Sequence, residues 1–311
     1  MQPDFNMNTV SVVSNRNSFR KLFDFACNKA DRNFRIDVDM IYDTMFFTRW
    51  EPSHTQLIKG YVNFGYGHEF EKAFTTFDEN LANSAGHHRI AQYSLGSLKC
   101  IMRFKADAYF DDAHEANIAY LDSDVPAETA TITESDISVP FQSLSLKSPE
   151  VEVQSHEVAL KSSEVESEST AKDGLTIKRN GRLIPPASIV EIKSRSKKTI
   201  MADIIPQLWL SQTKHLFVGY HRQGLIDQEP KYYDMAAHFR TWEFQHEKQL
   251  QALLGLNLRI REAIKGIDGR KGAIIYDHAE KSGKLKIYET DNTGLMALFD
   301  EEKKCWQREG K

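Results

Sequence analysis

The sequence predicts an α+β fold in which a mixed β-sheet is flanked by helices. The first observation is the alternation of apolar and polar residues at 34–40, which has the period of a half-buried strand. The second is that strand-like and helix-like segments follow one another without the regular alternation of a parallel βαβ fold. The third is the composition, because 41% hydrophobic and 27% charged residues are ordinary values for a globular protein.

The individual elements are predicted from their apolar spacing. Apolar and β-branched residues predict strands at 34–40, 45–50, 98–110, 188–194 and 216–220. Apolar residues at helical spacing predict a helix over 69–82, and residues 233–265 predict one long helix or two consecutive ones. Pro206 suits a first helical turn, which predicts a helix over 207–213. The segments KGAIIYD and KLKIYET predict a hairpin, and residues 295–306 predict a closing helix.

Residues 122–173 differ in composition from the rest of the chain. They contain 12 acidic residues, three lysines, 11 serines and a single aromatic residue. Such a segment cannot bury enough apolar surface to offset the entropy lost on ordering. We therefore expect a disordered acidic Ser/Glu-rich insertion within a single domain of residues 1–311, serving either as a tolerated surface loop or as a phosphorylated or partner-binding segment. The other residues carry 32 acids against 37 Lys and Arg, a mildly basic body that is compatible with a phosphate-rich partner.

Several protein classes are excluded or disfavoured. The three cysteines (Cys27, Cys100 and Cys305) are far apart and form no CxxC pair, which argues against a zinc ribbon or a disulfide scaffold and favours a reducing, intracellular setting. No apolar run approaches the roughly 20 residues of a membrane-spanning helix, and the opening residues lack the apolar core of a secretory signal. The phosphate-binding and nucleophile motifs GxxxxGK[ST], GxGxxG and GxSxG do not occur, which disfavours an NTPase, a dinucleotide oxidoreductase and an α/β-hydrolase.

The segment Ile189-Val-Glu-Ile-Lys-Ser194 is the strongest candidate for chemistry. On a strand, Glu191 and Lys193 share one face and Ile192 lies on the other. The apolar flanks predict a buried strand, where charged groups are costly unless they are paired or bind a metal. A nuclease site would explain both charges, with the carboxylate binding Mg²⁺ and the lysine orienting or deprotonating a water. A simple ion pair on an edge strand is the other interpretation.

Asp107 strengthens the nuclease interpretation. It lies in a strand-like run 84 residues before Glu191, and an Asp on one strand with E-x-K on the next is typical of the PD-(D/E)XK nuclease fold. Carboxylates converging from adjacent strands supply the oxygen ligands that Mg²⁺ prefers. Gln207, on the helix expected after the E-x-K strand, could reach the same site with its amide.

Five short segments, taken in chain order, resemble one family. They are RNSFRKLF (16–23), GHEFE (67–71), LGSLKCIMRFKAD (95–107), VEIK (190–193) and QLWLSQTKHLFVGY (207–220). They are similar to motifs of the DXO-type decapping and 5′-to-3′ exoribonucleases, and the chain resembles a divergent member of fungal type.

The resemblance implies a function and a set of site residues. The function would be removal of a cap, an NAD-type cap or 5′ phosphate groups from RNA, with onward 5′-to-3′ degradation, in mRNA quality control in the nucleus or cytoplasm. A nuclear 5′-to-3′ exoribonuclease would be a protein partner. Glu71, Asp107 and Glu191 would hold Mg²⁺ or Mn²⁺, Lys193 would contact the attacking water or scissile phosphate, Gln207 would help position that group, and Arg16 would bind a 5′ phosphate.

Lys105 departs from the family pattern. Where the family has E-V-D, this chain has Lys105-Ala-Asp107, and on a strand Lys105 faces the same way as Asp107. Its ammonium would stand beside the substrate, in the place of a metal-binding carboxylate, and would weaken or displace a second metal. An inactive RNA- or exoribonuclease-binding scaffold therefore stays open. A DNA-directed PD-(D/E)XK nuclease, which uses the same triad, is a third interpretation.

Three further features allow two interpretations each. The His87-His88-Arg89 run is expected to be a surface loop rather than a metal cluster. The basic stretch 193–198 is interpreted as a rim that attracts the RNA backbone rather than as a nuclear-import signal. Five aromatic residues could stack on bases but are expected to be core residues: Trp209, Tyr220, Tyr232, Tyr233 and Trp242.

Overall fold

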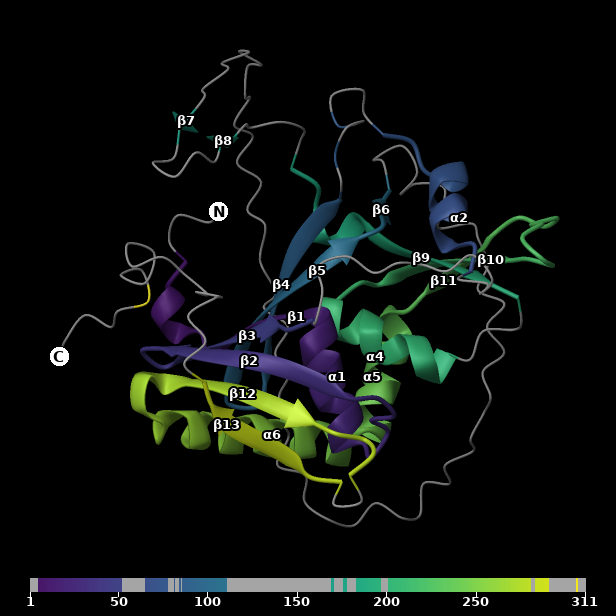
Figure 1. Ribbon diagram of the computed structural model, residues 1–311. Helices are drawn as coiled ribbons and strands as arrows, with labels where there is room; N and C mark the ends of the chain where they lie inside the picture. Colours follow the sequence, from purple (N-terminus) through teal and green to yellow (C-terminus); the bar gives the residue numbers. More distant parts are fainter. Residues whose placement is uncertain are drawn as a thin grey trace, which may run out of the picture.

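The structure, a computed structural model, describes residues 5–51, 65–77, 81, 84, 86–110, 169–170, 176–177, 183–196, 201–280, 283–290 and 306. These residues form a seven-stranded and a four-stranded sheet with flanking helices, which confirms the predicted α+β class (Figure 1). Of the predicted insertion at 122–173, residues 169–170 are described as a short strand, β7 (Ser169–Thr170), paired with β8 (Thr176–Ile177). The other residues of that insertion lie outside the described part of the chain, as does the helix predicted over 295–306 apart from Trp306.

The seven-stranded sheet has the order β13-β12-β2-β3-β1-β5-β4 within the described residues. Strand β1 runs parallel to both of its neighbours, β3 and β5, whereas the other pairs are antiparallel, so the sheet is mixed as predicted. The hairpin expected near the end of the chain is confirmed as β12 and β13. The bounds are β1 (Val12–Asn15), β2 (Phe34–Ile41), β3 (Thr44–Arg49), β4 (His87–Leu95), β5 (Leu98–Ala106), β12 (Lys271–Tyr276) and β13 (Leu285–Glu289).

The four-stranded sheet comprises β6 (Ala108–Tyr109), β9 (Ile189–Arg195), β10 (His215–Tyr220) and β11 (Lys231–Asp234), in the order β11-β10-β9-β6. The prediction of one continuous strand over 98–110 is wrong, because the chain leaves the seven-stranded sheet after β5 and joins the four-stranded sheet as β6. Asp107 lies at this break. Since Ala108 is opposite Val190 in the antiparallel β6–β9 pair, extending the register by one residue brings Asp107 opposite Glu191.

Two of the predicted helices differ in extent. Helix α2 (Gly67–Phe74) ends eight residues earlier than predicted, because Thr75 adopts an extended backbone conformation. Helix α4 (Met201–Ser211) begins five residues before Pro206, so the proline lies inside the helix and not at its start. Residues 233–265 contain two consecutive helices, α5 (Ala236–Gln245) and α6 (Glu247–Lys265). Short 3₁₀ helices span Met7–Thr9, Pro186–Ser188 and Asp268–Arg270.

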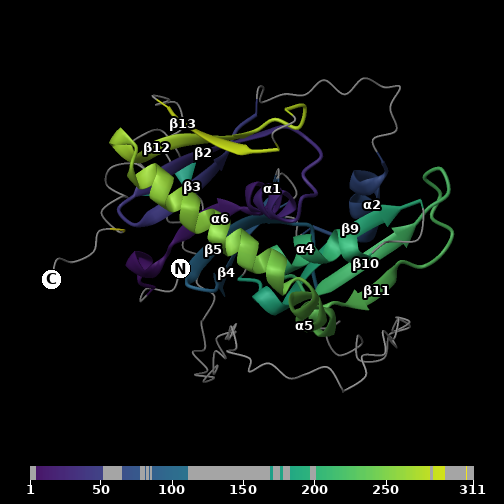
Figure 2. The same cartoon turned by 90° about the horizontal axis from the view of Figure 1, so that it is seen from below.

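Helix α1 (Arg16–Ala26) lies in the middle of the molecule, between the seven-stranded sheet and helices α4 and α6. Figure 2 shows α6 crossing beneath β2 and β12 and α2 lying beside β9. Phe19 and Leu22 of α1 pack in one fully buried cluster with Trp209 of α4 and Ile260 of α6. This core fixes α1, and with it the side chains that α1 presents to the four-stranded sheet. In the described part of the chain no helix is long and apolar enough to span a membrane.

Candidate active site

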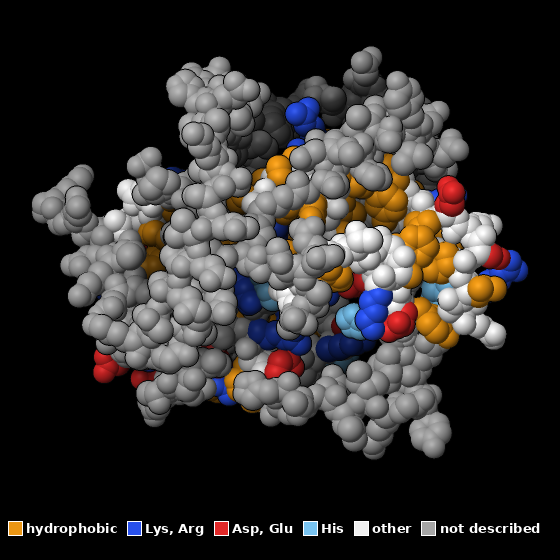
Figure 3. All heavy atoms as spheres, turned by 90° about the horizontal axis from the view of Figure 1, so that it is seen from above, with side chains coloured by type: hydrophobic (Ala, Val, Ile, Leu, Met, Phe, Trp, Pro, Cys, Tyr) orange, Lys and Arg blue, Asp and Glu red, His pale blue; other side chains and the backbone are white. Residues whose placement is uncertain are grey.

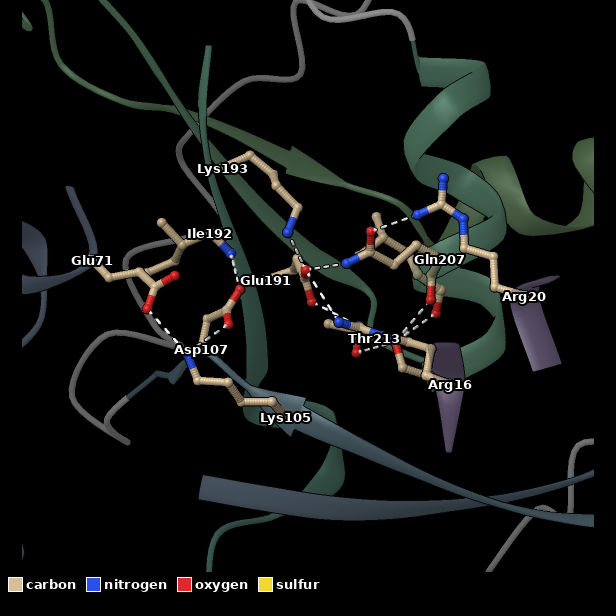
Figure 4. A network of polar contacts seen from close by, with 12 residues as sticks. Arg16, Arg20, Glu71, Lys105, Asp107, Glu191, Ile192, Lys193, Gln207 and Thr213 are labelled. Atoms are coloured by element: carbon tan, nitrogen blue, oxygen red, sulfur yellow. Dashed lines mark hydrogen bonds and ion pairs between the residues drawn. The ribbon is translucent and has the colours of Figure 1, made fainter. Parts of the chain in front are cut away.

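Glu191 lies at the centre of the candidate site, on β9, and only 2% of its surface is exposed. Lys193 is on the same face of the strand, as predicted, and its Nζ contacts Glu191 Oε1. The Nε2 of Gln207 donates to the same oxygen (Figure 4). Burial by itself would raise the pKa of Glu191, but the charges of Lys193 and Arg16 outweigh it and hold that pKa below its ordinary value. Glu191 is therefore an ionised carboxylate in the protein interior.

Arg16 reaches Glu191 from the first position of α1. The helix start is fixed by Asn15, whose side chain accepts a hydrogen bond from the Ser18 N–H at 2.8 Å. Nη1 of Arg16 donates to Glu191 Oε2 at 2.8 Å, and Nη2 lies 3.5 Å from Oε1. The guanidinium also lies over the Phe104 ring, 5.6 Å from its centroid. The side chain of Arg16 is 15% exposed, so it is a partly buried partner of the fully buried Glu191.

Gln207 connects Glu191 to a residue that sequence reasoning missed. Its Oε1 accepts a hydrogen bond from Nη1 of Arg20 at 3.3 Å, which orients the Gln207 amide toward Glu191. Arg20 lies one helical turn after Arg16, so both side chains project from the same face of α1. This i,i+4 spacing was the signal that could have identified Arg20. Ser211, also missed, accepts from Arg16 Nη1 at 3.2 Å.

Asp107 joins the site from the break between β5 and β6. Its Oδ2 accepts a hydrogen bond from the Ile192 N–H at 3.2 Å, and its Oδ1 lies 4.0 Å from Lys105 Nζ. Burial, followed by the negative charge of Glu191, raises the pKa of Asp107 to about 6 against the opposing effect of Lys193. Asp107 and Glu191 are thus two carboxylates close enough to repel one another.

Glu71 comes from α2 and is the third acidic residue of the site. Its Oε2 lies 3.3 Å from the Nζ of Lys105, and its side chain is 25% exposed. The adjacent Phe70 is buried beneath α2 against Val190 and Ile192 of β9, which places Glu71 on the site. Glu71 is therefore an ion-paired residue and not a free charge on the helix surface.

The donor chemistry of these residues suits a divalent cation. Glu71, Asp107 and Glu191 bring carboxylates to the cluster from three separate elements, and oxygen ligands are those that Mg²⁺ and Mn²⁺ prefer. Yet the described residues include no group of three His, Cys, Asp or Glu side chains arranged to hold one metal ion. Their oxygens contact the cationic groups of Arg16, Lys105 and Lys193 instead, and three acids against three bases leave the cluster without net charge.

A cavity of about 530 Å³ adjoins the cluster, with Asp107 in its wall. Its volume falls within the range of small-molecule binding sites. The Nε of Arg89, another wall residue, is buried without a hydrogen-bond partner among the described residues. Figure 3 shows hydrophobic side chains gathered beside charged ones on this face of the molecule. Six aromatic side chains line the cavity: Phe70, Phe74, Phe77, Tyr109, Phe110 and Phe217.

The remaining sequence interpretations have mixed outcomes. The loop predicted at His87 and His88 is wrong, because both belong to β4, but the expected surface position is confirmed for His88, which is exposed. Trp209 and Trp242 are buried core residues, as expected. Tyr220, Tyr232 and Tyr233 are each partly buried on β10 and β11. The last two residues of the basic stretch 193–198 lie outside the described part of the chain.

A protein-family model described as "Domain of unknown function (DUF8563)" matches residues 1–168 and 142–306. The two overlapping matches together cover most of the sequence. No curated protein matches the sequence.

Solved structures provide a likeness in fold. Dxo1 of K. lactis, in complex with manganese, is 9% identical, with a TM-score of 0.50 over 94% of this chain and 69% of that chain. Rai1 of Candida albicans with pU5 and Mn²⁺ is 10% identical, with a TM-score of 0.49 over 91% and 70%. Rai1 of S. pombe with 3′-FADP is 13% identical, with a TM-score of 0.49 over 86% and 69%. The similarity to Dxo1 shows a shared fold and confirms the predicted fold class.

Proposed function

This chain belongs to the DUF8563 family and shares the fold of Dxo1, and we propose that it is a metal-dependent nuclease acting on RNA 5′ ends. The observation that carries the proposal is that side chains from distant parts of the sequence come together. Residues from five separate segments, each similar to a motif of the DXO-type family, lie in one cluster (Figure 4). In chain order, the first segment supplies Arg16, the second Glu71, the third Lys105 and Asp107, the fourth Glu191 and Lys193, and the fifth Gln207.

Glu71, Asp107 and Glu191 would hold Mg²⁺ or Mn²⁺, because they supply carboxylate oxygens from three different elements. When bound, such a cation supplies Lewis-acid polarisation of a phosphate and a water of lowered pKa. The break between β5 and β6 supports this role for Asp107, since it brings a second carboxylate opposite the buried Glu191.

Lys193, Gln207 and Arg16 would bind or orient the phosphate and the attacking water. Lys193 stands beside Glu191, where its ammonium could orient the attacking water or neutralise charge on the scissile phosphate. Gln207, held by Arg20, would position the same group. The guanidinium of Arg16 contacts Glu191 in this structure, and its planar fork also matches phosphate oxygens, so we propose that it contacts a phosphate of the 5′ end when RNA binds.

The substrate class follows from the surroundings of the cluster. A cavity with aromatic walls suits a nucleobase or a cap base next to the reacting phosphates. We therefore propose removal of a cap, an NAD-type cap or 5′ phosphates, followed by 5′-to-3′ degradation. A nuclear or cytoplasmic location, a role in mRNA quality control and association with a 5′-to-3′ exoribonuclease belong to the same proposal.

The test uses 5′-labelled RNAs that carry a monophosphate, a triphosphate, a methylated or unmethylated guanosine cap, or an NAD cap. Each is incubated with Mg²⁺, Mn²⁺ or EDTA. Glu191→Gln should lower the rate about a hundredfold or more, because it removes a charged group from the reacting centre. Glu289→Gln, an exposed residue of β13, is the matched control and should leave the rate unchanged. Equal activity of Glu191→Gln and the wild type would refute the site.

A binding scaffold is the second candidate, and the contacts of Lys105 favour it. An ammonium that neutralises Glu71 and Asp107 would oppose metal binding and chemistry. Folded protein that binds the labelled RNAs without cleaving any of them would support the scaffold. Single-stranded DNA of the same sequence, run in parallel, separates an RNA-directed from a DNA-directed nuclease, since an RNA enzyme can read the 2′-OH.

A further inference from the structure

Lys105 contacts two of the three acidic residues of the cluster. Its Nζ lies 3.3 Å from Glu71 Oε2 and 4.0 Å from Asp107 Oδ1, so one ammonium bridges carboxylates from α2 and from the β5–β6 break. Figure 4 shows the Lys105 ammonium between these two acids, on the side of β9 away from Arg16. The bridge therefore holds two of the three candidate metal ligands.

The three residues of this bridge differ in freedom to move. The side chain of Lys105 is 44% exposed and has a flexible four-carbon stem, whereas those of Glu71 and Asp107 are 25% and 9% exposed. The ammonium can leave toward solvent at little cost, because exposed ion pairs are weak. The Asp107 carboxylate also accepts a hydrogen bond from the Ile192 N–H, so its position does not depend on Lys105 alone.

The charge of the cluster determines what can replace that ammonium. Three carboxylates face Arg16, Lys105 and Lys193, so the cluster has no surplus negative charge to attract a divalent cation. A cation arriving alone would compete with the Lys105 ammonium for the same oxygens and meet its repulsion. A phosphate arriving together with the cation removes this conflict, because it offers the ammonium a new anionic partner.

We propose that Lys105 couples metal binding to the binding of a 5′ phosphate group. Without RNA, its ammonium bridges Glu71 and Asp107 and keeps metal affinity low. A 5′ phosphate draws the ammonium away, and both carboxylates then accept the metal. This inference rests on the proposed function for its substrate class and adds the order in which the site is filled.

The experiment measures Mn²⁺ binding to the full chain by the electron paramagnetic resonance signal of free Mn²⁺. The RNA probe is a five-nucleotide oligoribonucleotide with phosphorothioate linkages to resist cleavage, bearing a 5′ phosphate or, as its matched control, a 5′ hydroxyl. The proteins are the wild type, Lys105→Met and Lys99→Met. Lys99 is an exposed lysine of the same strand, β5, and controls for the loss of one positive charge.

Wild-type protein should bind Mn²⁺ about tenfold more tightly with the 5′-phosphorylated probe than without RNA, and the 5′-hydroxyl probe should have little effect. Lys105→Met should bind Mn²⁺ about tenfold more tightly than wild type in the absence of RNA and should lose most of the coupling. Lys99→Met should behave as the wild type. Because binding couplings are reciprocal, Mn²⁺ should strengthen binding of the phosphorylated probe by the same factor.

Equal Mn²⁺ affinity of wild type and Lys105→Met, or unchanged coupling in the variant, would overturn the inference. Absence of Mn²⁺ binding in every protein would overturn it as well. The proposed function is judged separately, on cleavage of unmodified RNAs. Coupling between Mn²⁺ and the phosphorylated probe without cleavage of any RNA would refute the nuclease but keep the inference. Cleavage without that coupling would support the nuclease and refute the inference. Near-identical circular dichroism and thermal midpoints would confirm that both variants fold.

Discussion

Replacing Arg16 with methionine should destabilise the protein, because it removes a hydrogen-bonding cation from a buried carboxylate. Glu191 is 2% exposed, and Arg16 is held against it at 2.8 Å. Methionine keeps a long side chain over Phe104 but cannot donate a hydrogen bond. Glu191 would then rely on Lys193 and Gln207 alone.

The magnitude follows from what remains around Glu191. Removing one partner of a buried ion pair costs about 3–5 kcal/mol when the other charge is left unpaired. A single hydrogen bond to a charged group contributes about 1.5–3 kcal/mol. Because Lys193 still neutralises Glu191, we expect a loss in the range of a single charged hydrogen bond, about 2 kcal/mol. At about 2–4 °C per kcal/mol for a domain of this size, Tm should fall by about 4–8 °C.

The assay is urea unfolding in EDTA, followed by tryptophan fluorescence, since Trp209 and Trp242 are buried. Arg20→Met is the matched control on the same helix, because Arg20 contacts Gln207 and not Glu191, and it should cost less than about 1 kcal/mol. A double-mutant cycle of Arg16→Met with Glu191→Gln should give a coupling of about 1 kcal/mol or more. A loss below about 0.5 kcal/mol with no coupling would refute the reasoning.

Three further predictions concern packing, the cavity and the thiols. Gly219→Ala should destabilise the protein by about 1–3 kcal/mol in urea unfolding, because a Cβ there would overlap the ring of Phe70. Phe74→Ala, which removes an exposed aromatic wall of the cavity, should raise KM for capped RNA about fivefold or more in steady-state kinetics, with kcat within about twofold. Burial raises the pKa of Cys27 to about 11, so the thiolate is about one part in a thousand at pH 8. Iodoacetamide should therefore alkylate it at least about tenfold more slowly in folded Cys305→Ser protein than in urea, as followed by mass spectrometry.

Each of these predictions has an internal check. Adding Phe70→Leu to Gly219→Ala should restore part of the lost stability, and no recovery would mean that the ring is not the cause. Tyr288→Ala, a similarly exposed aromatic on β13, should leave KM unchanged. An equal KM in Phe74→Ala and the wild type would argue against base stacking in the cavity. Alkylation of Cys27 in the folded protein at the rate seen in urea would contradict its burial. Cys100, whose pKa is raised to about 12 by burial, serves as the buried reference thiol in the same experiment.

Local patterns predicted the elements whose shape depends on neighbouring residues. The alternation at 34–40 corresponds to β2, and the two apolar runs joined by a polar turn correspond to β12 and β13. The shared face of Glu191 and Lys193 was also predictable, because a strand alternates its side chains whatever packs against it. The fold class and the E-x-K ion pair could therefore be inferred from the sequence.

Contacts between distant segments decided the rest. The strand predicted over 98–110 is interrupted at Asp107, because β5 and β6 pair with different partners, and no local pattern encodes the choice of partner. Likewise α4 begins five residues before Pro206, so the proline lies inside the helix. There the burial of Ile204 and Ile205 in the core offsets the helix-breaking tendency of the proline. The helix and strand preferences of a local sequence therefore predict structure poorly where tertiary packing opposes them.

The same distinction applies to the candidate site. The sequence by itself determined which residue types could carry the chemistry, including Arg16, Asp107, Glu191 and Lys193, because charge and hydrogen-bonding capacity belong to each side chain. Only the tertiary structure decided that Arg16 neutralises a carboxylate 175 positions away and that Lys105 bridges Glu71 and Asp107. The physical reason is that electrostatic interactions depend on distance and burial in three dimensions, which only the packing of α1, α2 and the two sheets establishes.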